Sequence, residues 1–216
     1  MAVVNISVLS TPAKRYHHGN LRAALIEAAL ELAREGGPEA VVLREVSRRA
    51  GVSHNAAYRH FADRDALLQA VCERCMGALA RLMEAGIGAV DPADSSLAAA
   101  RQRLRATGSA YIEFALSEPG WFRTAFAVPE GLGYLDEGQG VGEGGLGPLE
   151  LLGAQLDAVA AAGGLPAERR PDAELAAWSA VHGLSMLLLE GPLRSLGEPE
   201  RHLAVARLLD TIERGL

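Results

Sequence analysis

The sequence predicts an all-α fold, and three observations support this prediction. Apolar residues recur at steps of three and four through most of the chain, which is the period of an amphipathic helix. Sustained alternation of polar and β-branched apolar residues, the pattern of a half-buried strand, is missing from the sequence. Glycine and proline, at 24 and 10 of 216 residues, stand mainly between the periodic stretches and divide them into separate helices.

Length and composition are those of a soluble globular protein with one or two domains. Hydrophobic residues make up 49% of the chain and charged residues 22%, so it can bury a core and is unlike a disordered or fibrous chain. No apolar run approaches the roughly 20 residues of a membrane span, and residues 1–12 lack the basic start of a signal peptide. We therefore expect a cytoplasmic protein with no membrane partner.

Four helices are predicted in the first third of the chain, after a flexible tail at 1–13. They cover about 21–35, 43–50 and 54–60, followed by a long helix from residue 64. Asn20, Ser53 and Asp63 stand just before the first, third and fourth of them, where a side-chain oxygen can accept a free backbone N–H of the first turn. A Gly-Gly-Pro break at 36–38 ends the first helix.

The second and third helices have the spacing of a helix-turn-helix. The tetrapeptide Ala50-Gly51-Val52-Ser53 joins them, and Gly51 can take the positive φ that so short a reversal requires. Val52 can fill the angle between the two helices. The third helix then starts after Ser53 with its N-terminus free to enter a major groove of DNA.

The distribution of charge supports a nucleic-acid partner for this part of the chain. The protein is acidic overall, with a net charge of -6, but residues 1–70 carry nine Lys or Arg against seven Asp or Glu, and four of the six histidines. The other residues carry 12 against 20. Such asymmetry is typical of a nucleic-acid-binding module joined to a module with another role.

Beyond about residue 85 the composition changes, and a second set of helices is predicted. They cover about 93–116, 119–126, 149–162, 172–189 and 198–214. Residues 129–147 contain eight glycines, and we expect a mobile or disordered loop there. These glycines do not form a phosphate-binding fingerprint, because no strand pattern precedes them.

The helix-turn-helix segment resembles a known family. The stretch LREVSRRAGVS at 43–53, followed by YRHF at 58–61 and RDALL at 64–68, is similar to the DNA-binding domain of the TetR/AcrR family of transcriptional regulators. The stretch WSAVHG at 178–183 resembles the Trp-His-Gly signature of one C-terminal variety of that family. The resemblance implies a three-helix helix-turn-helix DNA-binding domain at 14–62 and a helical ligand-binding and dimerisation domain at 63–216.

The resemblance also implies which residues contact double-stranded DNA. His54 and Asn55, in the first turn of the third helix, would lie nearest the base edges, and Arg44 would read a guanine through its N7 and O6 acceptors. Other members of the set would bind backbone phosphates. In chain order the expected contact residues are Lys14, Arg15, His17, Arg44, Ser53, His54, Asn55, Tyr58, His60 and Arg64.

Two pairs of residues resemble metal ligands without completing a site. Cys72 and Cys75 form a Cys-x-x-Cys, and His17 and His18 are adjacent, but neither pair has further ligands at a suitable spacing. On a helix the two cysteines are more typical of a buried pair. We therefore expect no metal and no cofactor.

The last two helices predict a homodimer. The helix at 172–189 is apolar nearly all round, and such a helix must be covered on every side. The helix at 198–214 adds an apolar stripe that starts at Val205. Pairing both helices with their symmetry mates gives a four-helix interface, which the resemblance also implies. The dimer would present two recognition helices to an inverted-repeat, palindromic operator.

The scarce aromatic residues gather in this second part and predict a ligand cavity. Trp178, His182 and Met186 are spaced by four and share one helix face. His182 has two interpretations: a core histidine bonded to a neighbouring carbonyl, or a polar group in the wall of a mostly apolar cavity that takes a small hydrophobic effector. The expected cavity residues are Tyr111, Phe114, Trp121, Phe122, Trp178, His182 and Met186.

Together these features predict a sequence-specific transcriptional regulator, a repressor that its effector releases from a palindromic operator. Two alternatives stay open. In the first, the C-terminal helices serve dimerisation alone and no effector binds. The second, a small all-α enzyme, is disfavoured, because the sequence has no nucleophile–base set, no paired carboxylates and no metal-ligand spacing.

Overall fold

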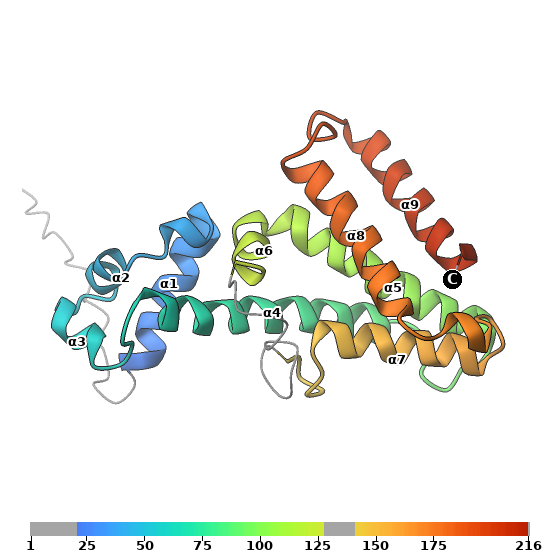
Figure 1. Cartoon of the computed structure of the whole chain (residues 1–216), viewed down its shortest axis with the longest axis horizontal. Helices are drawn as coiled ribbons and strands as arrows, with labels where there is room; N and C mark the ends of the chain where they lie inside the picture. The colour runs from blue at the N-terminus through green and yellow to red at the C-terminus, as the bar shows by residue number, and fades with distance from the viewer. Residues whose placement is uncertain (1–20, 128–140, 216) are drawn as a thin grey trace, which may run out of the picture.

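The computed structural model describes residues 21–127 and 141–215 (Figure 1). Within these ranges the regular structure is helical and contains no strand, which confirms the predicted all-α fold. The α-helices are α1 Leu21–Gly36, α2 Leu43–Arg49, α3 His54–Tyr58, α4 Arg64–Gly88, α5 Leu97–Ser117, α6 Pro119–Ala125, α7 Pro148–Ala161, α8 Ala173–Leu189 and α9 Glu198–Gly215. Among the described residues, none of the helices combines the length and hydrophobicity that a bilayer crossing needs. The expected tail at 1–13 and the Asn20 cap lie outside these residues.

The helix boundaries in the first third follow the predicted capping residues. Ser53 Oγ accepts the Ala56 N–H at 3.2 Å, and Asp63 Oδ1 accepts the Ala66 N–H at 2.8 Å. Each bond satisfies a donor that the first turn of a helix leaves without an intrahelical partner. The positive φ of Gly37, at 71°, marks the end of α1.

α5 begins later than the sequence predicts, at Leu97 instead of about residue 93. The carboxylates of Asp91 and Asp94 accept the N–H groups of Ala93 and Ser96, at 2.9 and 2.8 Å. Such local side-chain bonds offer the backbone an alternative to the helix, so the chain turns twice before α5 can start.

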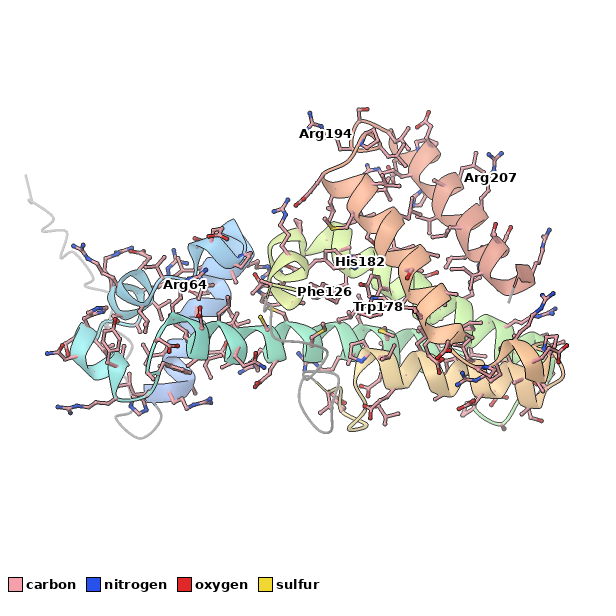
Figure 2. The ribbon with its side chains drawn as sticks, in the orientation of Figure 1. Arg64, Phe126, Trp178, His182, Arg194 and Arg207 are labelled. Atoms are coloured by element: carbon pink, nitrogen blue, oxygen red, sulfur yellow. The ribbon has the colours of Figure 1, made fainter. Side chains whose placement is uncertain are left out.

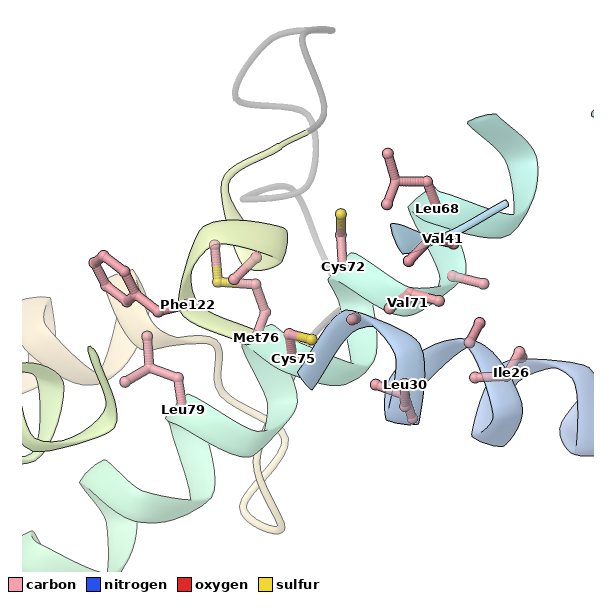
Figure 3. Packing of buried hydrophobic residues seen from close by; sticks show 14 of the residues in the cluster. Ile26, Leu30, Val41, Leu68, Val71, Cys72, Cys75, Met76, Leu79 and Phe122 are labelled. Atoms are coloured by element: carbon pink, nitrogen blue, oxygen red, sulfur yellow. The ribbon is translucent and has the colours of Figure 1, made fainter. Parts of the chain in front are cut away.

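α4 is the helix that connects the two ends of the molecule. It starts beside the helix-turn-helix and runs across the structure, and α5, α6 and α7 pack along it (Figure 1). Figure 3 shows α1 and α6 packed on α4, with Leu30 of α1, Cys75 and Leu79 of α4 and Phe122 of α6 among the buried side chains. These residues belong to one hydrophobic cluster, so a continuous core joins α1 to the C-terminal helices.

α6 approaches the end of α1 at very short range. A Cβ atom built on Gly120 would lie 2.3 Å from the carbonyl oxygen of Ala33 and 2.4 Å from that of Arg34, so this position requires a glycine. Next to it, Trp121 Nε1 donates to the Leu30 carbonyl at 2.8 Å. The Arg34 guanidinium also stacks over the Trp121 ring, 5.0 Å from its centroid.

The Gly-rich segment lies partly within the described residues, since 128–140 fall outside them. Residues 141–147 form a turn fixed to α4, in place of the expected mobile loop. The two carboxylate oxygens of Glu84 accept the N–H groups of Glu143, at 2.8 Å, and Gly144, at 2.9 Å. The turn leads directly into α7, whose position is therefore tied to α4.

α8 and α9 form a hairpin that packs on α5 (Figure 1). In the single chain this hairpin exposes large apolar side chains: Leu175 is 62% exposed, Leu187 43% and Leu203 50%. α8, which the sequence predicts to be apolar nearly all round, thus has one buried side and one exposed apolar side.

Candidate nucleic-acid interface and ligand cavity

The turn between α2 and α3 has the geometry that the sequence predicts. Gly51 has a φ of 69°, a left-handed conformation that L side chains rarely adopt. Val52 is half-buried and packs against the core, and the buried Ala57 and Phe61 hold α3 on it. The Arg22 guanidinium lies 5.1 Å from the centroid of the Phe61 ring. α3 is therefore fixed by its inner side, and its outer side is free.

The outer side of α3 carries the residues expected to contact DNA. His54, Asn55, Tyr58 and His60 are all exposed, and the His54 and Tyr58 rings meet edge to face with 4.8 Å between centroids. Arg44, in the first turn of α2, is exposed as well. α2 and α3 lie together at the end of the molecule opposite α8 and α9 (Figure 1). Lys14, Arg15 and His17 lie outside the described residues.

Ion pairs separate the arginines of this region into two groups. Arg48 donates to Glu45, with Nε at 2.9 Å, and Arg49 donates to both oxygens of Glu35, at 2.8 and 2.9 Å. Arg44, in contrast, has no ion pair with any described residue. A guanidinium without a protein carboxylate keeps its donors available for phosphate oxygens or base edges.

Arg64, which we expect to contact a DNA phosphate, bonds instead to backbone carbonyls of the protein (Figure 2). Its Nε donates to the Val41 carbonyl at 2.9 Å and its Nη2 to the Pro38 carbonyl at 2.6 Å. These bonds tie the first turn of α4 to the segment that precedes α2. Arg64 thus orients the helix-turn-helix on α4, and only part of its guanidinium is left for a phosphate.

A cavity of about 50 Å³ lies where α4, α5, α7, α8 and α9 meet. Its walls are almost wholly apolar and include Met76, Met83, Leu104, Gly108, Tyr111, Leu152, Trp178, Val181, Leu209 and Ile212. Its polar groups include two bonded pairs, Tyr111 with Trp178 and Arg105 with Glu213. A mostly apolar space with few polar groups is typical of sites for small hydrophobic ligands.

Trp178, Tyr111 and His182 form a hydrogen-bonded chain beside the cavity, and Figure 2 labels Trp178 and His182. Trp178 Nε1 donates to the Tyr111 hydroxyl at 3.0 Å, and this hydroxyl lies 2.8 Å from His182 Nδ1. Since the indole N–H can only donate, the Tyr111 hydroxyl accepts it through one of its lone pairs, and the direction of the bond between the hydroxyl and Nδ1 follows the histidine tautomer. Burial lowers the pKa of His182, which favours its neutral ring. His182 is thus a bonded histidine, with a tyrosine hydroxyl in place of the expected carbonyl.

Most of the predicted ligand-site residues do not line this cavity. Of that set, Tyr111 and Trp178 line it. The others lie in the core or against neighbouring helices, and these are Phe114, Trp121, Phe122, His182 and Met186. The prediction groups residues by aromatic character and by helix face, and neither property fixes which element covers a side chain.

The sequence prediction misses most of the cavity wall. Leu104, Thr107 and Gly108 share a face of α5 with the predicted Tyr111, so this face is a signal present in the sequence. Nothing local, however, distinguishes a helix face that borders a cavity from one that fills a core.

Two sequence models of known families match the chain. The model for bacterial regulatory proteins of the tetR family matches residues 25–71, which hold α2, α3 and parts of α1 and α4. The model for the tetracyclin repressor-like C-terminal domain matches residues 104–212, half of the chain. The chain belongs to the TetR family. The resemblance stated from the sequence is thereby confirmed.

Curated HTH-type relatives match a short stretch of the chain. The HTH-type transcriptional repressor Rv3405c of Mycobacterium tuberculosis and the HTH-type transcriptional regulator Mb3439c of Mycobacterium bovis are each 38% identical over 61 residues. This stretch is 28% of the chain and 32% of each relative, so the match spans about a third of the curated relatives' length.

Solved structures share the fold over nearly the whole chain. A protein of unknown function from Rhodococcus sp. RHA1 is 30% identical, with a TM-score of 0.72, over 94% of this chain and 99% of that one. FadR from Bacillus subtilis, in complex with stearoyl-CoA, is 14% identical with a TM-score of 0.59, over 90% and 99% of the two chains. A TetR variant from Acinetobacter baumannii AYE, in complex with minocycline, is 20% identical with a TM-score of 0.59, over 90% and 94%. The last two similarities show the fold alone.

Membership of the TetR family decides the class of function. The matched family consists of DNA-binding transcriptional regulators, and the curated relatives carry that description. The chain is therefore a TetR-family transcriptional regulator with a DNA-binding domain, and the enzyme alternative is set aside.

Proposed function

We propose that this TetR-family regulator is a cytoplasmic repressor that binds a palindromic operator as a homodimer and leaves it when a small, mostly hydrophobic effector binds. One observation carries the proposal. α4 begins beside the helix-turn-helix and also lines the apolar cavity, through Met76 and Met83. An effector that fills the cavity therefore acts on the helix that supports the DNA-binding surface, and it can favour one spacing of the two surfaces in a dimer.

In the proposed complex, α3 of each subunit lies in a major groove. The Asn55 amide suits the donor and acceptor of an adenine, and the unpaired Arg44 suits the two acceptors of a guanine. Tyr58 and His60 bind phosphates along the groove, and Lys14 and the other basic residues ahead of α1 extend these contacts. In this scheme residues 14–62 recognise DNA, and residues 63–216 serve effector binding and dimerisation.

The exposed apolar side of the α8–α9 hairpin supports the homodimer. Leu187 of α8 and Leu203 of α9 are large and exposed in the single chain, and covering such side chains with a partner is favourable by about 25 cal/mol per Å² of apolar surface. A symmetric pair of hairpins covers both helices at once. The two DNA-binding surfaces then face an inverted repeat.

Selection of bound duplexes from a random DNA library tests the operator directly. We expect an enriched palindrome whose affinity falls steeply with salt, because phosphate contacts release counterions. A Leu187→Glu, Leu203→Glu double variant should be monomeric in sedimentation and should lose affinity for the palindrome. Leu146→Glu, which makes one such substitution at an exposed leucine outside the hairpin, should change neither property. Selection without a palindrome would overturn the operator proposal.

The small volume of the cavity favours one competing function, a DNA-binding dimer without an effector. A space of about 50 Å³ holds only a few water molecules, so any larger effector requires a side chain to move. A screen for compounds that release the selected operator separates the two functions. Release by hydrophobic compounds supports the regulated repressor, and a library in which none releases the operator supports the dimer alone.

A further inference from the structure

An open groove lies next to the cavity, between α7 and the first half of α8. It has a volume of about 670 Å³ and is lined in part by the exposed side chains of Ala154 and Leu175. Leu149 of α7 and Trp178 of α8 line both the groove and the cavity. Their side chains therefore form a wall between the cavity and the groove.

The indole of Trp178 is the polar part of this wall. Its N–H donates to the Tyr111 hydroxyl, with Nε1 at 3.0 Å, and the Phe126 ring stands 6.2 Å away between centroids (Figure 2). Rotation of the indole toward the groove breaks this bond and joins the two spaces. The joined space falls in the ~300–1,000 Å³ range of ligand pockets.

The edge of the cavity near α9 is a poor passage for an apolar molecule. There Arg105 donates to Asp210 at 2.6 Å and to Glu213 at 2.7 Å, so the side chains at that edge are charged and paired. An apolar molecule that passes them removes water from three charged groups, which is unfavourable. The groove also has charged residues in its lining, among them Arg170 paired with Asp157 and Glu174, but the side chains between it and the cavity are the neutral Trp178 and Leu149.

We propose that the effector is a compact aromatic molecule that enters from this groove, displaces the Trp178 indole and donates its own N–H or O–H to Tyr111. The inference rests on the proposed effector function and specifies the ligand class. Displacement takes from the Tyr111 hydroxyl the N–H that it now accepts, and a buried polar group that loses a partner is destabilised. A phenol or an aromatic amine restores the bond, whereas an ether of the same shape cannot.

Isothermal titration of the full chain with 2-naphthol and 2-methoxynaphthalene tests the donor. Both ligands share the ring system, and only the naphthol has an O–H. We expect the naphthol to bind wild-type protein about tenfold more tightly, the ratio for a lost hydrogen bond of moderate strength. The two ligands should bind Tyr111→Phe equally. Equal binding to the wild type, or a preference that survives in Tyr111→Phe, would overturn the proposal.

Fluorine NMR tests the displacement of the indole. Protein labelled with 5-fluorotryptophan has one signal for Trp121 and one for Trp178, because the chain contains two tryptophans. The Trp178→Phe variant assigns them. We expect 2-naphthol to shift the Trp178 signal toward its position in urea and to leave the Trp121 signal, from the α1–α6 contact, unchanged. A bound naphthol that leaves the Trp178 signal in place contradicts the displacement.

A bulky side chain in the groove tests whether the ligand enters through it. Ala154→Phe narrows the groove, and Ala161→Phe is the matched control, an exposed alanine two turns farther along α7. In stopped-flow measurements with 2-naphthol, Ala154→Phe should slow association, because the added ring narrows the path to Trp178. Ala161→Phe should keep wild-type rates. Wild-type rates in Ala154→Phe would rule out this entrance.

Different experiments decide between the aromatic effector and the effector-regulated repressor. If neither naphthalene binds to the wild-type protein, the aromatic-effector proposal falls. The proposed regulator is decided independently, by whether any compound in the screen releases the selected operator.

Discussion

Replacing Gly120 by alanine should separate α6 from α1. The new Cβ would lie 2.3 Å from the Ala33 carbonyl oxygen and 2.4 Å from that of Arg34, whereas ordinary contacts begin near 3.4 Å. Both neighbours are backbone atoms of a packed helix, so α6 must shift by about 1 Å, a change of the size that overpacked cores show. The shift strains the Trp121–Leu30 hydrogen bond, which is 2.8 Å long.

We expect the Gly120→Ala variant to lose about 1–3 kcal/mol of unfolding free energy, the usual range for an extra methyl group in a packed contact. In a chain of this length that loss corresponds to a fall in Tm of roughly 2–12 °C. Thermal unfolding followed by circular dichroism measures it. Gly88→Ala is the control: it lies in α4, and an added Cβ meets no atom within 4 Å, so its Tm should stay the same or rise. A Gly120→Ala variant that melts with the wild-type protein would refute the close approach.

Three further predictions concern thiols, pH and DNA. Burial raises the pKa of Cys72 to about 12 and raises that of Cys75 as well. Ellman's reagent at pH 8 should therefore leave both thiols unmodified until urea unfolds the protein. Prompt reaction of the native protein would contradict their burial. Burial lowers the pKa of His182 in the folded protein. As the pH falls, the imidazole of the unfolded chain is therefore protonated before that of the folded protein, and the free energy of unfolding should decline below pH 6.5, the ordinary pKa of histidine. Urea unfolding at pH 7.5 and 5.5 should show a smaller decline in the free energy of unfolding for His182→Gln than for the wild-type protein. Equal declines in the two proteins would refute His182 as the cause. Arg44→Ala should weaken operator binding by about 1–3 kcal/mol in fluorescence anisotropy, and Arg48→Ala, whose guanidinium is paired, much less; equal losses would contradict the distinction between them.

The features that the sequence predicts well are those with local causes. Ser53 and Asp63 cap their helices through bonds to residues three positions away, and Gly51 takes the positive φ that the short turn needs. The start of α5 is missed although its cause is also local, because the Asp91 and Asp94 carboxylates hold turns where the apolar period already suggests a helix.

The features that the sequence does not predict come from residues far apart in the chain. Trp121 bonds a carbonyl 91 positions away, at Leu30, and Arg64 bonds one 23 positions away, at Val41. Glu84 holds a turn about 60 positions later. Neither residue type nor helical period reveals these partners, because each depends on how whole helices pack.

Local patterns in the sequence were enough to establish the helices, the helix-turn-helix and the family, since caps, period and turn glycines act over a few residues. The packing of the helices was needed to establish where the cavity lies, which residues line it, and that Trp178 separates it from the groove. Those properties arise from the packing of α4, α5, α7, α8 and α9, which are far apart in the sequence, so no single stretch of the chain determines them.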